Sequence, residues 1–422
     1  MTQHRSLRMA ALVGTLGVLS AFGATSAFCQ SVSSIEFVPN PVAPSDLDRT
    51  QIQAGARAQG MGGTDLIGND VTYAAYNPAS IARSGPSSAS ITAVSRSSNI
   101  HVDKINDLSK GLKDLSNQLN GSDNSLVGVR EAFKKVYNFA TNAGANDTTA
   151  SPADLSANIA PLAGFSVKNI GLVGYGTLSA KVQLQAQAIP VPGLNDSPTG
   201  KVAAGYGVLG LSNIAIPFSI PVAVGTVGIS PRFTQASYAG AGFVADETDA
   251  TSFGSTNGVP NGSISGATYK EVHQQKFDLD LGFTSIPDPL YHVRGAVVIH
   301  NLLSPTYHLP LLVNGSSLGK SATLTNFDFQ MKPQIDVGVL RETKGLSLAA
   351  ELHNLGNVNG GKRSVHLGAE YAVAHSVFLR GGYDQSRFVI GVGFAFSGVR
   401  LDLATGSKPQ EQAALSLTFG GR

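Results

Sequence analysis

The sequence is poor in charged residues and in cysteine. Aspartate, glutamate, lysine and arginine together make up 14% of the residues, against about 25% in typical soluble domains. A single cysteine, Cys29, is present, which excludes a disulfide framework as the means of holding an exported protein together. The basic residues are dispersed rather than clustered, and this argues against nucleic-acid binding, which leaves a concentrated basic footprint.

The apolar run near the start of the chain is too short to cross a membrane as a helix. It covers residues 10–24, whereas a membrane-spanning helix needs about 20 apolar residues. Arg5 and Arg8 precede it, and small residues at 24–27 follow it, which is the pattern of a cleaved secretory signal. We therefore expect residues 1–29 to be a signal peptide and the mature chain to be exported.

Glycine is abundant in the sequence, and apolar residues alternate with polar ones through most of the chain. In residues 390–397, an isoleucine, a valine and two phenylalanines alternate with glycine, alanine and serine. Segments around 277–283, 335–339, 365–373 and 415–419 repeat this period of two. Because successive side chains of a strand point to opposite faces, each segment has one apolar face and one polar or glycine face.

The distribution of charge over these faces favours a membrane barrel over a soluble sandwich. A charge facing lipid costs about 2–4 kcal/mol at the middle of the membrane, whereas charges inside a lumen can pair and remain hydrated. The sequence predicts an all-β fold, a transmembrane antiparallel β-barrel of about 14 strands beginning near Ser87. The charged residues expected to line its lumen are Asp278, Asp280, Arg294, Asp336, Glu351, Glu370, Arg380, Arg400 and Asp402. His292 and His300 are expected to face the lumen as well, too far apart along one strand to bind one metal.

The connections between the predicted strands are alternately long and short. Short periplasmic turns and long outer loops are typical of such barrels, so the alternation supports an even number of strands. The short connections are residues 341–345 and 374–376. The long ones are residues 99–158, 190–201, 245–269, 303–331 and 354–363.

The first long connection departs from the strand pattern. Leucines and other apolar residues recur at helical spacing through residues 102–140, which predicts two amphipathic helices. We expect a helical insert, residues 102–158, in the first outer loop. The helices either pack on each other and cap the barrel mouth or present a docking surface for a partner.

A search for catalytic chemistry gives no nucleophile and no metal or cofactor motif. The glycine cluster at residues 60–63 lacks the Lys-Ser/Thr of a phosphate-binding loop, and there is no G-x-S-x-G motif. Glu351 and His366 fall side by side across a predicted hairpin, where a hydrogen bond in the lumen is favoured over catalysis. The sequence therefore predicts no enzyme activity, no catalytic residues, no metal site and no cofactor.

The stretch at residues 54–80, AGARAQGMGGTDLIGNDVTYAAYNPAS, carries the strongest motif of the chain. It resembles the N-terminal signature of the FadL-like outer-membrane barrels, which include the PorV-type and conjugal-transfer TraF-like groups. The resemblance implies a hatch that plugs the barrel from inside, residues 30–85, ahead of a barrel formed by residues 86–422. Glycine lets a backbone run close to a crowded wall, and an arginine there can bind lumen carboxylates. The residues of this hatch motif are Gly55, Arg57, Gly60, Gly62, Gly63, Asn77 and Pro78.

The TraF-like group is the most similar of these, on motifs at residues 277–282, 367–371 and 379–383 and on a strand that closes at Asn301. The resemblance implies location in the outer membrane of a Gram-negative type envelope and passage of small hydrophobic molecules through a hatch-gated lumen. The alternative is a non-transporting outer-membrane component of a conjugation or secretion apparatus. The expected partners are outer-membrane lipid, a small hydrophobic ligand and components of such an apparatus, with no nucleic acid.

Overall fold

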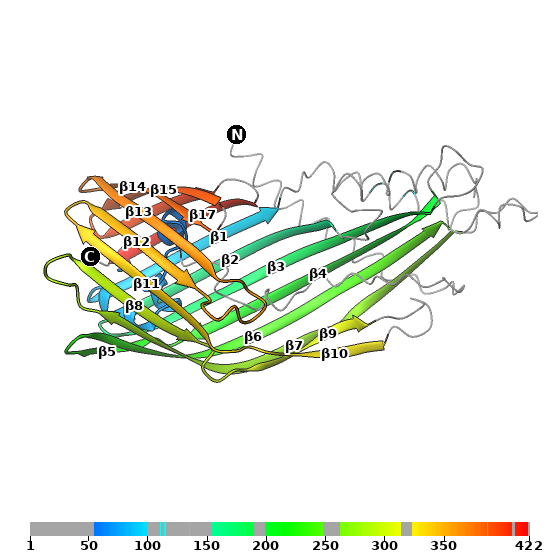
Figure 1. Ribbon diagram of the computed structural model, residues 1–422, viewed down its shortest axis with the longest axis horizontal. Coiled ribbons are helices and arrows are strands. Elements are labelled where there is room, and N and C mark those ends of the chain that lie inside the picture. Colours follow the sequence, from blue (N-terminus) through cyan, green and yellow to red (C-terminus); the bar gives the residue numbers. More distant parts are fainter. Residues whose placement is uncertain are drawn as a thin grey trace, which may run out of the picture.

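The computed structural model describes most of the chain after residue 54. The described residues are 55–98, 153–189, 199–247, 262–313, 323–385, 387–406 and 410–420, with the single residues Lys110, Asp114 and Lys135. Their strands form one antiparallel sheet that closes on itself, together with a separate two-stranded hairpin (Figure 1). The predicted signal peptide and the first part of the predicted hatch, residues 30–54, lie outside the described residues.

Fourteen strands close the barrel within the described part of the chain. The ring closes because β1 pairs with both β2 and β17, while β2 also pairs with β3. The short strand β5 (Phe218–Val222) continues β4 after a break at Pro217 and pairs with β6, so it adds no position to the ring. The strands of the ring are β1 (Ser87–Ser98), β2 (Ala153–Val167), β3 (Ile170–Ile189), β4 (Thr199–Ala215), β6 (Gly225–Glu247), β7 (Gly262–Ser285), β8 (Val293–His300), β11 (Gln334–Thr343), β12 (Leu346–His353), β13 (Ser364–Ala374), β14 (Val377–Asp384), β15 (Arg387–Phe396), β16 (Val399–Gly406) and β17 (Gln410–Gly420). The predicted strand number and the start near Ser87 are confirmed.

The barrel wall is much taller on one side than on the other. We call β3, β4, β6 and β7 the long wall, because they have between 17 and 24 residues. The short wall is β8 and β11–β17, whose strands have between 8 and 11 residues. In Figure 1 the long wall extends to the right well beyond the short wall.

The outer face of the ring is apolar and exposed, as the alternation predicted. Phe388 and Ile390 are 73% and 64% exposed, while Val389 between them is 3% exposed. Water would disfavour such a surface, whereas the hydrocarbon of a membrane matches it. The same outward exposure is found at Ile91, Phe165, Leu178, Ile214, Phe233, Phe277, Val297, Val339, Leu352, Leu367, Leu379, Leu403 and Leu415.

Four of the five predicted long connections are shorter or more ordered than expected. β4 already begins at Thr199, within the connection expected over residues 190–201, and β6 and β7 extend to Glu247 and from Gly262 into the one expected over 245–269. The predicted insert and first loop ran to residue 158, but β2 begins at Ala153 because this end of the strand pairs with the outer half of β3. The connection between β8 and β11 contains its own hairpin, β9 (Thr306–Val313) and β10 (Thr323–Gln330). Apart from Lys110, Asp114 and Lys135, which have helical backbone, residues 102–152 lie outside the described residues, so the helical insert stays a prediction.

A segment that precedes β1 lies inside the barrel, and we call residues 55–84 the luminal segment. It contains the helical turns α2 (Gly55–Gly60), η4 (Val71–Ala75) and η5 (Pro78–Arg83). In Figure 1 these blue helical segments are enclosed by the strands, at the end of the barrel where short turns connect neighbouring strands. α2 contacts β1 and β14–β17, η4 contacts β1–β3, and η5 contacts β3 and β5–β7, so the segment touches most of the ring. None of the helices in the described residues is long and apolar enough to span a membrane.

Candidate functional site

The luminal segment meets the short wall backbone to backbone, at the glycines of its opening motif. A side chain at Gly62 would overlap the backbone of β13 and β14, and one at Gly368 or Gly382 would overlap the backbone of residues 61–62. The His366 Nδ1–H donates to the Gly62 carbonyl oxygen at 2.8 Å. Gly62 also has a φ of 76°, which other residues rarely adopt. This contact therefore requires glycine on both sides.

The other glycines of the motif are also close to the wall. Gly55 begins α2, and a Cβ atom there would lie 3.2 Å from Ser416 Oγ. At Gly60 a Cβ atom would lie 3.1 Å from the Gly391 Cα of β15. Gly63 has a φ of 79° and ends the turn after α2. The small residues of the segment thus let α2 lie directly on the strands.

Arg57 joins the luminal segment to a cluster of charges on the short wall. Its guanidinium donates two hydrogen bonds to Glu370, at 3.0 and 2.6 Å. Glu370 also accepts from Arg380 at 2.6 Å and from Arg400 at 3.0 Å, and both of these arginines pair with Asp402. Three guanidinium groups thus face two carboxylates in a buried network. A wall carboxylate is the kind of partner that the sequence predicted for Arg57.

Asn77 and Pro78 fix the second half of the luminal segment. The Asn77 side-chain oxygen accepts from the Ala79 N–H at 3.0 Å and caps η5, with Pro78 at the first turn. The Asn77 amide nitrogen donates to the Leu66 carbonyl at 2.7 Å and to Thr284 of the long wall at 3.0 Å. One fully buried side chain thus caps a helix, closes a loop of the segment and binds the barrel.

Two further lumen charges of the predicted set lie away from the Arg57 cluster. Asp278 of the long wall accepts from Arg232 at 2.6 Å, and both side chains are buried. Arg294 donates to Glu342 at 3.3 Å near the short turns, and Glu342 also accepts from Arg83 of the luminal segment. The predicted charges therefore form separate groups around the lumen rather than one site.

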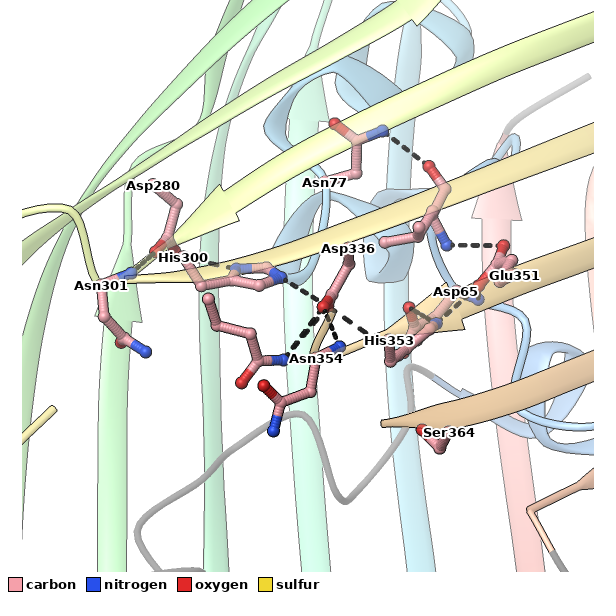
Figure 2. Close-up of polar contacts among 12 residues, drawn as sticks. Asp65, Asn77, Asp280, His300, Asn301, Asp336, Glu351, His353, Asn354 and Ser364 are labelled. Carbon is pink, nitrogen blue, oxygen red and sulfur yellow. Dashed lines mark hydrogen bonds and ion pairs between the residues drawn. The ribbon is translucent and has the colours of Figure 1, made fainter. Parts of the chain in front are cut away.

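A chain of alternating carboxylates and imidazoles crosses from the long wall to β12 (Figure 2). His300 Nδ1 lies 3.8 Å from Asp280, and His300 Nε2 lies 3.3 Å from Asp336. His353 Nδ1 lies 3.8 Å from the same Asp336 carboxylate, and His353 Nε2 donates to Glu351 at 2.9 Å. All five side chains are buried. Of these five residues, the sequence had assigned Asp280, His300, Asp336 and Glu351 to the lumen, and it had not singled out His353.

The chain ends at Asp65 of the luminal segment. Glu351 accepts from the backbone N–H groups of Asp65 and Leu66, at 2.9 and 3.1 Å. The Asp65 carboxylate is fully buried and accepts no hydrogen bond from the described part of the chain. Burial raises the pKa of Asp65 well above its ordinary value, His353 opposes this shift, and Glu351 and Asp336 reinforce it. An isolated carboxylate at this position is therefore costly without a proton or a cation.

An apolar contact lies on the other side of the luminal segment. Here η4 and η5 pack against the inner face of β2, β3 and β4 through apolar side chains. Tyr76 and Tyr175 approach with their ring centroids 6.3 Å apart. The buried residues of this cluster are Val71, Ala74, Ala75, Tyr76 and Ile81 of the luminal segment and Leu162, Val173, Tyr175 and Ala215 of the wall.

A family model described as "F plasmid transfer operon, TraF, protein" matches residues 74–393. The match covers well over half of the chain and includes nearly all of the barrel. The chain belongs to this TraF family. The predicted resemblance to the TraF-like group is thereby confirmed. The glycine-rich half of the opening motif, before residue 74, lies outside the match.

Solved outer-membrane barrels resemble the TraF-family chain over most of its length. The CymD monoaromatic hydrocarbon channel has a TM-score of 0.47 at 14% identity, covering 87% of this chain and 97% of that one. A Pseudomonas aeruginosa FadL homologue gives 0.43 at 12% identity, with 87% and 98% covered. The P. putida toluene transporter TodX gives 0.42 at 10% identity, with 87% and 98% covered. The comparison with curated proteins gave no match.

Sequence reasoning missed several residues at the interface between the luminal segment and the TraF-family barrel. Glu351 and His353 lie two residues apart, and the period of two places them on one strand face, so this pair was open to prediction. Glu351 and His366 do pair in register as predicted, but Glu351 binds His353 instead, and Ser364 donates to His366. Asp65 has no periodic signal, since it lies in a loop. The sequence predicted no metal site, yet the structure brings Asp65, Glu351 and His353 together.

Proposed function

We propose that this TraF-family barrel is a hatch-gated channel for small hydrophobic molecules in the outer membrane. In this proposal residues 1–29 are the export signal, the luminal segment is the hatch, and the barrel performs no enzyme reaction. The observation that carries the proposal is the apolar contact of the luminal segment with β2–β4, which lies apart from the Arg57 cluster on the short wall. In the proposal the charged cluster holds the hatch in place, and the apolar contact lies on the path that the hatch closes.

Further apolar residues lie above the luminal segment on the long wall. Leu209 and Leu211 of β4 and Ala236 and Tyr238 of β6 are buried on the inner face, nearer to the long loops than the contact with η4. A hydrophobic molecule that enters along this surface meets the contact between Tyr76 and Tyr175. Displacing η4 would expose further apolar wall to it, whereas displacing η5 would also break the ion pair of Arg83 with Glu342. Ligand sites of this kind are mostly apolar with few polar groups.

The contacts of the luminal segment support its role as a movable hatch. The segment has no strand in the ring and is held by side-chain hydrogen bonds, ion pairs and close backbone contacts. The ring closes through backbone pairing between its own strands. Removal of the segment therefore leaves every backbone pair of the wall intact.

Deletion of residues 55–84 tests the channel. We expect the variant to fold into a heat-modifiable barrel with a higher single-channel conductance in planar bilayers than the wild type. Liposomes containing the variant should admit a small aromatic solute faster than a polar solute of equal size. A folded variant whose conductance equals that of the wild type would contradict gating, and equal uptake of the two solutes would contradict the hydrophobic path.

The alternative function, a non-transporting component of a conjugation or secretion apparatus, is favoured by a different observation. An apolar groove of about 790 Å³ lies on the outer face of the ring across β14–β17, β1 and β2. Its outward side chains include Leu379, Ile390, Leu403 and Leu415, all well exposed. Alanines, valines, Ile159, Gly391, Ser95, Thr405 and Arg380 complete the lining, and α2 contacts β1 and β14–β17 in this region. Such a groove suits an apolar segment of a partner within the membrane.

The two functions are separated by filling the groove. Substitution of Ala413 by Trp, on the lining of the groove, should leave conductance and uptake unchanged if the barrel is a channel. If the barrel serves an apparatus, the same variant should lose conjugation or secretion in cells while its folding remains normal. The deletion of residues 55–84 then serves as the reverse control, since it alters permeation and leaves the groove residues in place.

A further inference from the structure

We propose that Asp65, Glu351 and His353 bind one divalent transition-metal ion, which joins the luminal segment to β12. The ligands are one carboxylate from the luminal segment and a carboxylate and an imidazole from the wall. This site is independent of whether the barrel transports, because it rests on the ligand geometry alone.

The three side chains converge on one point. One ligand atom from each lies within 4.8 Å of the others. His353 Nε2 is 2.9 Å from Glu351 Oε2 and 3.8 Å from Asp65 Oδ1. Two ligand atoms that each lie about 2.1 Å from one ion are separated by roughly 3.0–3.5 Å. The observed distances bracket this range, so an ion fits after small side-chain adjustments.

The Asp65 carboxylate supplies a second, independent observation. It is fully buried, and neither of its oxygen atoms accepts a hydrogen bond from the described residues. Buried carboxylates are ordinarily hydrogen-bonded, paired or bound to a metal. Figure 2 shows this side chain beside Glu351 and His353, at the meeting point of the luminal segment and the wall. The ion-pair partner of Asp65 among the described residues is His353, 3.8 Å away, and a cation held between the three residues would coordinate the Asp65 carboxylate directly.

The charges balance when the ion is bound. The proton that His353 Nε2 now donates to Glu351 must leave to solvent, and the nitrogen then offers its lone pair to the ion. The carboxylates of Asp65 and Glu351 supply two negative charges against the two positive charges of the ion. No net charge then remains buried at the site.

Neighbouring groups already orient the ligands. The Glu351 carboxylate is fixed by the N–H groups of Asp65 and Leu66. The other ring nitrogen of His353 faces Asp336 at 3.8 Å, and Asp336 is held by the Asn354 N–H at 2.7 Å. A carboxylate behind a ligating histidine is the usual support of a metal site.

The ligand types select among the common ions. Calcium takes six to eight oxygen ligands and magnesium keeps several waters, whereas this site offers three side chains, one of which is an imidazole. Imidazole favours zinc, iron, copper or nickel, and zinc accepts His, Asp and Glu in four-coordinate sites. Zinc is therefore the probe for the test.

The experiment measures zinc retained by the full-length, tag-free barrel in detergent after loading with zinc sulfate and gel filtration. We expect about one zinc per chain in the wild type, in keeping with a single site. Asp65→Asn and His353→Gln should weaken zinc binding by at least about tenfold, since loss of a mere supporting group costs 10–100-fold. His375→Gln, at an exposed turn between β13 and β14, is the matched control and should bind zinc as the wild type does.

Three results would overturn the proposal. They are a wild type that retains no zinc, an Asp65→Asn variant that retains zinc fully, and a His375→Gln variant that loses it. X-ray absorption of the zinc-loaded wild type makes the test independent of variant folding. One imidazole with oxygen ligands is expected, and two or more imidazoles would show that zinc lies elsewhere.

Discussion

Arg57 of the luminal segment binds Glu370 of β13 through two hydrogen bonds, from Nε at 3.0 Å and from Nη2 at 2.6 Å. The planar guanidinium matches the carboxylate in this two-point geometry, which a lysine cannot reproduce. Burial by itself would lower the pKa of Arg57, but Glu370, together with Tyr73 and Asp70, more than offsets this and holds the pKa above its ordinary value. The pair therefore stays charged and anchors the segment to the wall.

Replacement of Arg57 by Ala should loosen the luminal segment without unfolding the barrel. Glu370 keeps Arg380 and Arg400 as partners, so the loss is smaller than the 3–5 kcal/mol of a fully unpaired buried charge. We expect the free energy that protects the segment from opening to fall by about 1–3 kcal/mol. Hydrogen exchange of residues 55–84 measures it. The exchange rate of Arg57→Lys should lie between those of Arg57→Ala and the wild type. Exchange in Arg57→Ala as slow as in the wild type would contradict the role of Arg57 as an anchor.

Glycine at position 382 should be required, whereas glycine at the neighbouring position 381 should not. A Cβ atom at Gly382 would overlap the backbone of Gly62, while one at Gly381 meets nothing within 4 Å. Gly382→Ala should therefore displace the luminal segment, and Gly381→Ala should leave it in place. Trypsin cleavage after Arg83 in folded barrels reports the displacement. Equal cleavage of the two variants would show that close contact at this point is unimportant.

Asn77 should be sensitive to loss of its amide as well as to loss of its helix cap. Aspartate caps helices as well as asparagine does, so Asn77→Asp would be harmless if capping of η5 were its only role. The Asn77 amide also donates to Leu66 and Thr284, and a carboxylate there would face the Leu66 carbonyl without a proton. We expect Asn77→Asp to destabilise the segment by about 1–3 kcal/mol, as Asn77→Ala does. Hydrogen exchange of residues 55–84, measured at increasing temperature, compares the two variants.

The outward face of β15 should tolerate no charge. Ile390 is 64% exposed on the outside of the ring, and arginine on the lipid side costs about 2–4 kcal/mol near the middle of the membrane. Ile390→Arg should lower the free energy of unfolding of the liposome-embedded barrel by up to that amount, as measured by urea titration. His375→Arg at the exposed turn is the control and should have no effect. A cost shared by both variants, or by neither, would contradict a membrane-facing wall.

The sequence by itself determined the ring of the barrel. Alternation with a period of two fixes which side chains of a strand share a face, and lipid outside a polar lumen decides which face is apolar. These local rules gave the all-β class, the strand number and the short turns near residues 344 and 375. These rules misplaced some strand ends. β2 begins earlier than expected, at Ala153, because it pairs with the long strand β3, and β6 and β7 extend into their predicted loop because they pair with each other as far as Glu247 and Gly262.

The sequence also indicated that the glycine-rich opening motif lies close to a wall, because only glycine permits such contact. It did not show which wall residues are involved. Gly62 lies against Gly368 and Gly382, more than 300 positions away in the chain, and no local pattern encodes that distance.

Only the tertiary structure decided how the lumen is arranged. The lumen charges fall into separate groups because the closed ring sets their spacing, and Asp65 meets Glu351 and His353 because a loop from one end of the chain is packed against a strand from the other. Such meetings depend on long-range packing of segments that have no shared periodicity. The sequence fixes the faces of each strand, but the closure of the ring and the packing of the luminal segment determine which faces meet.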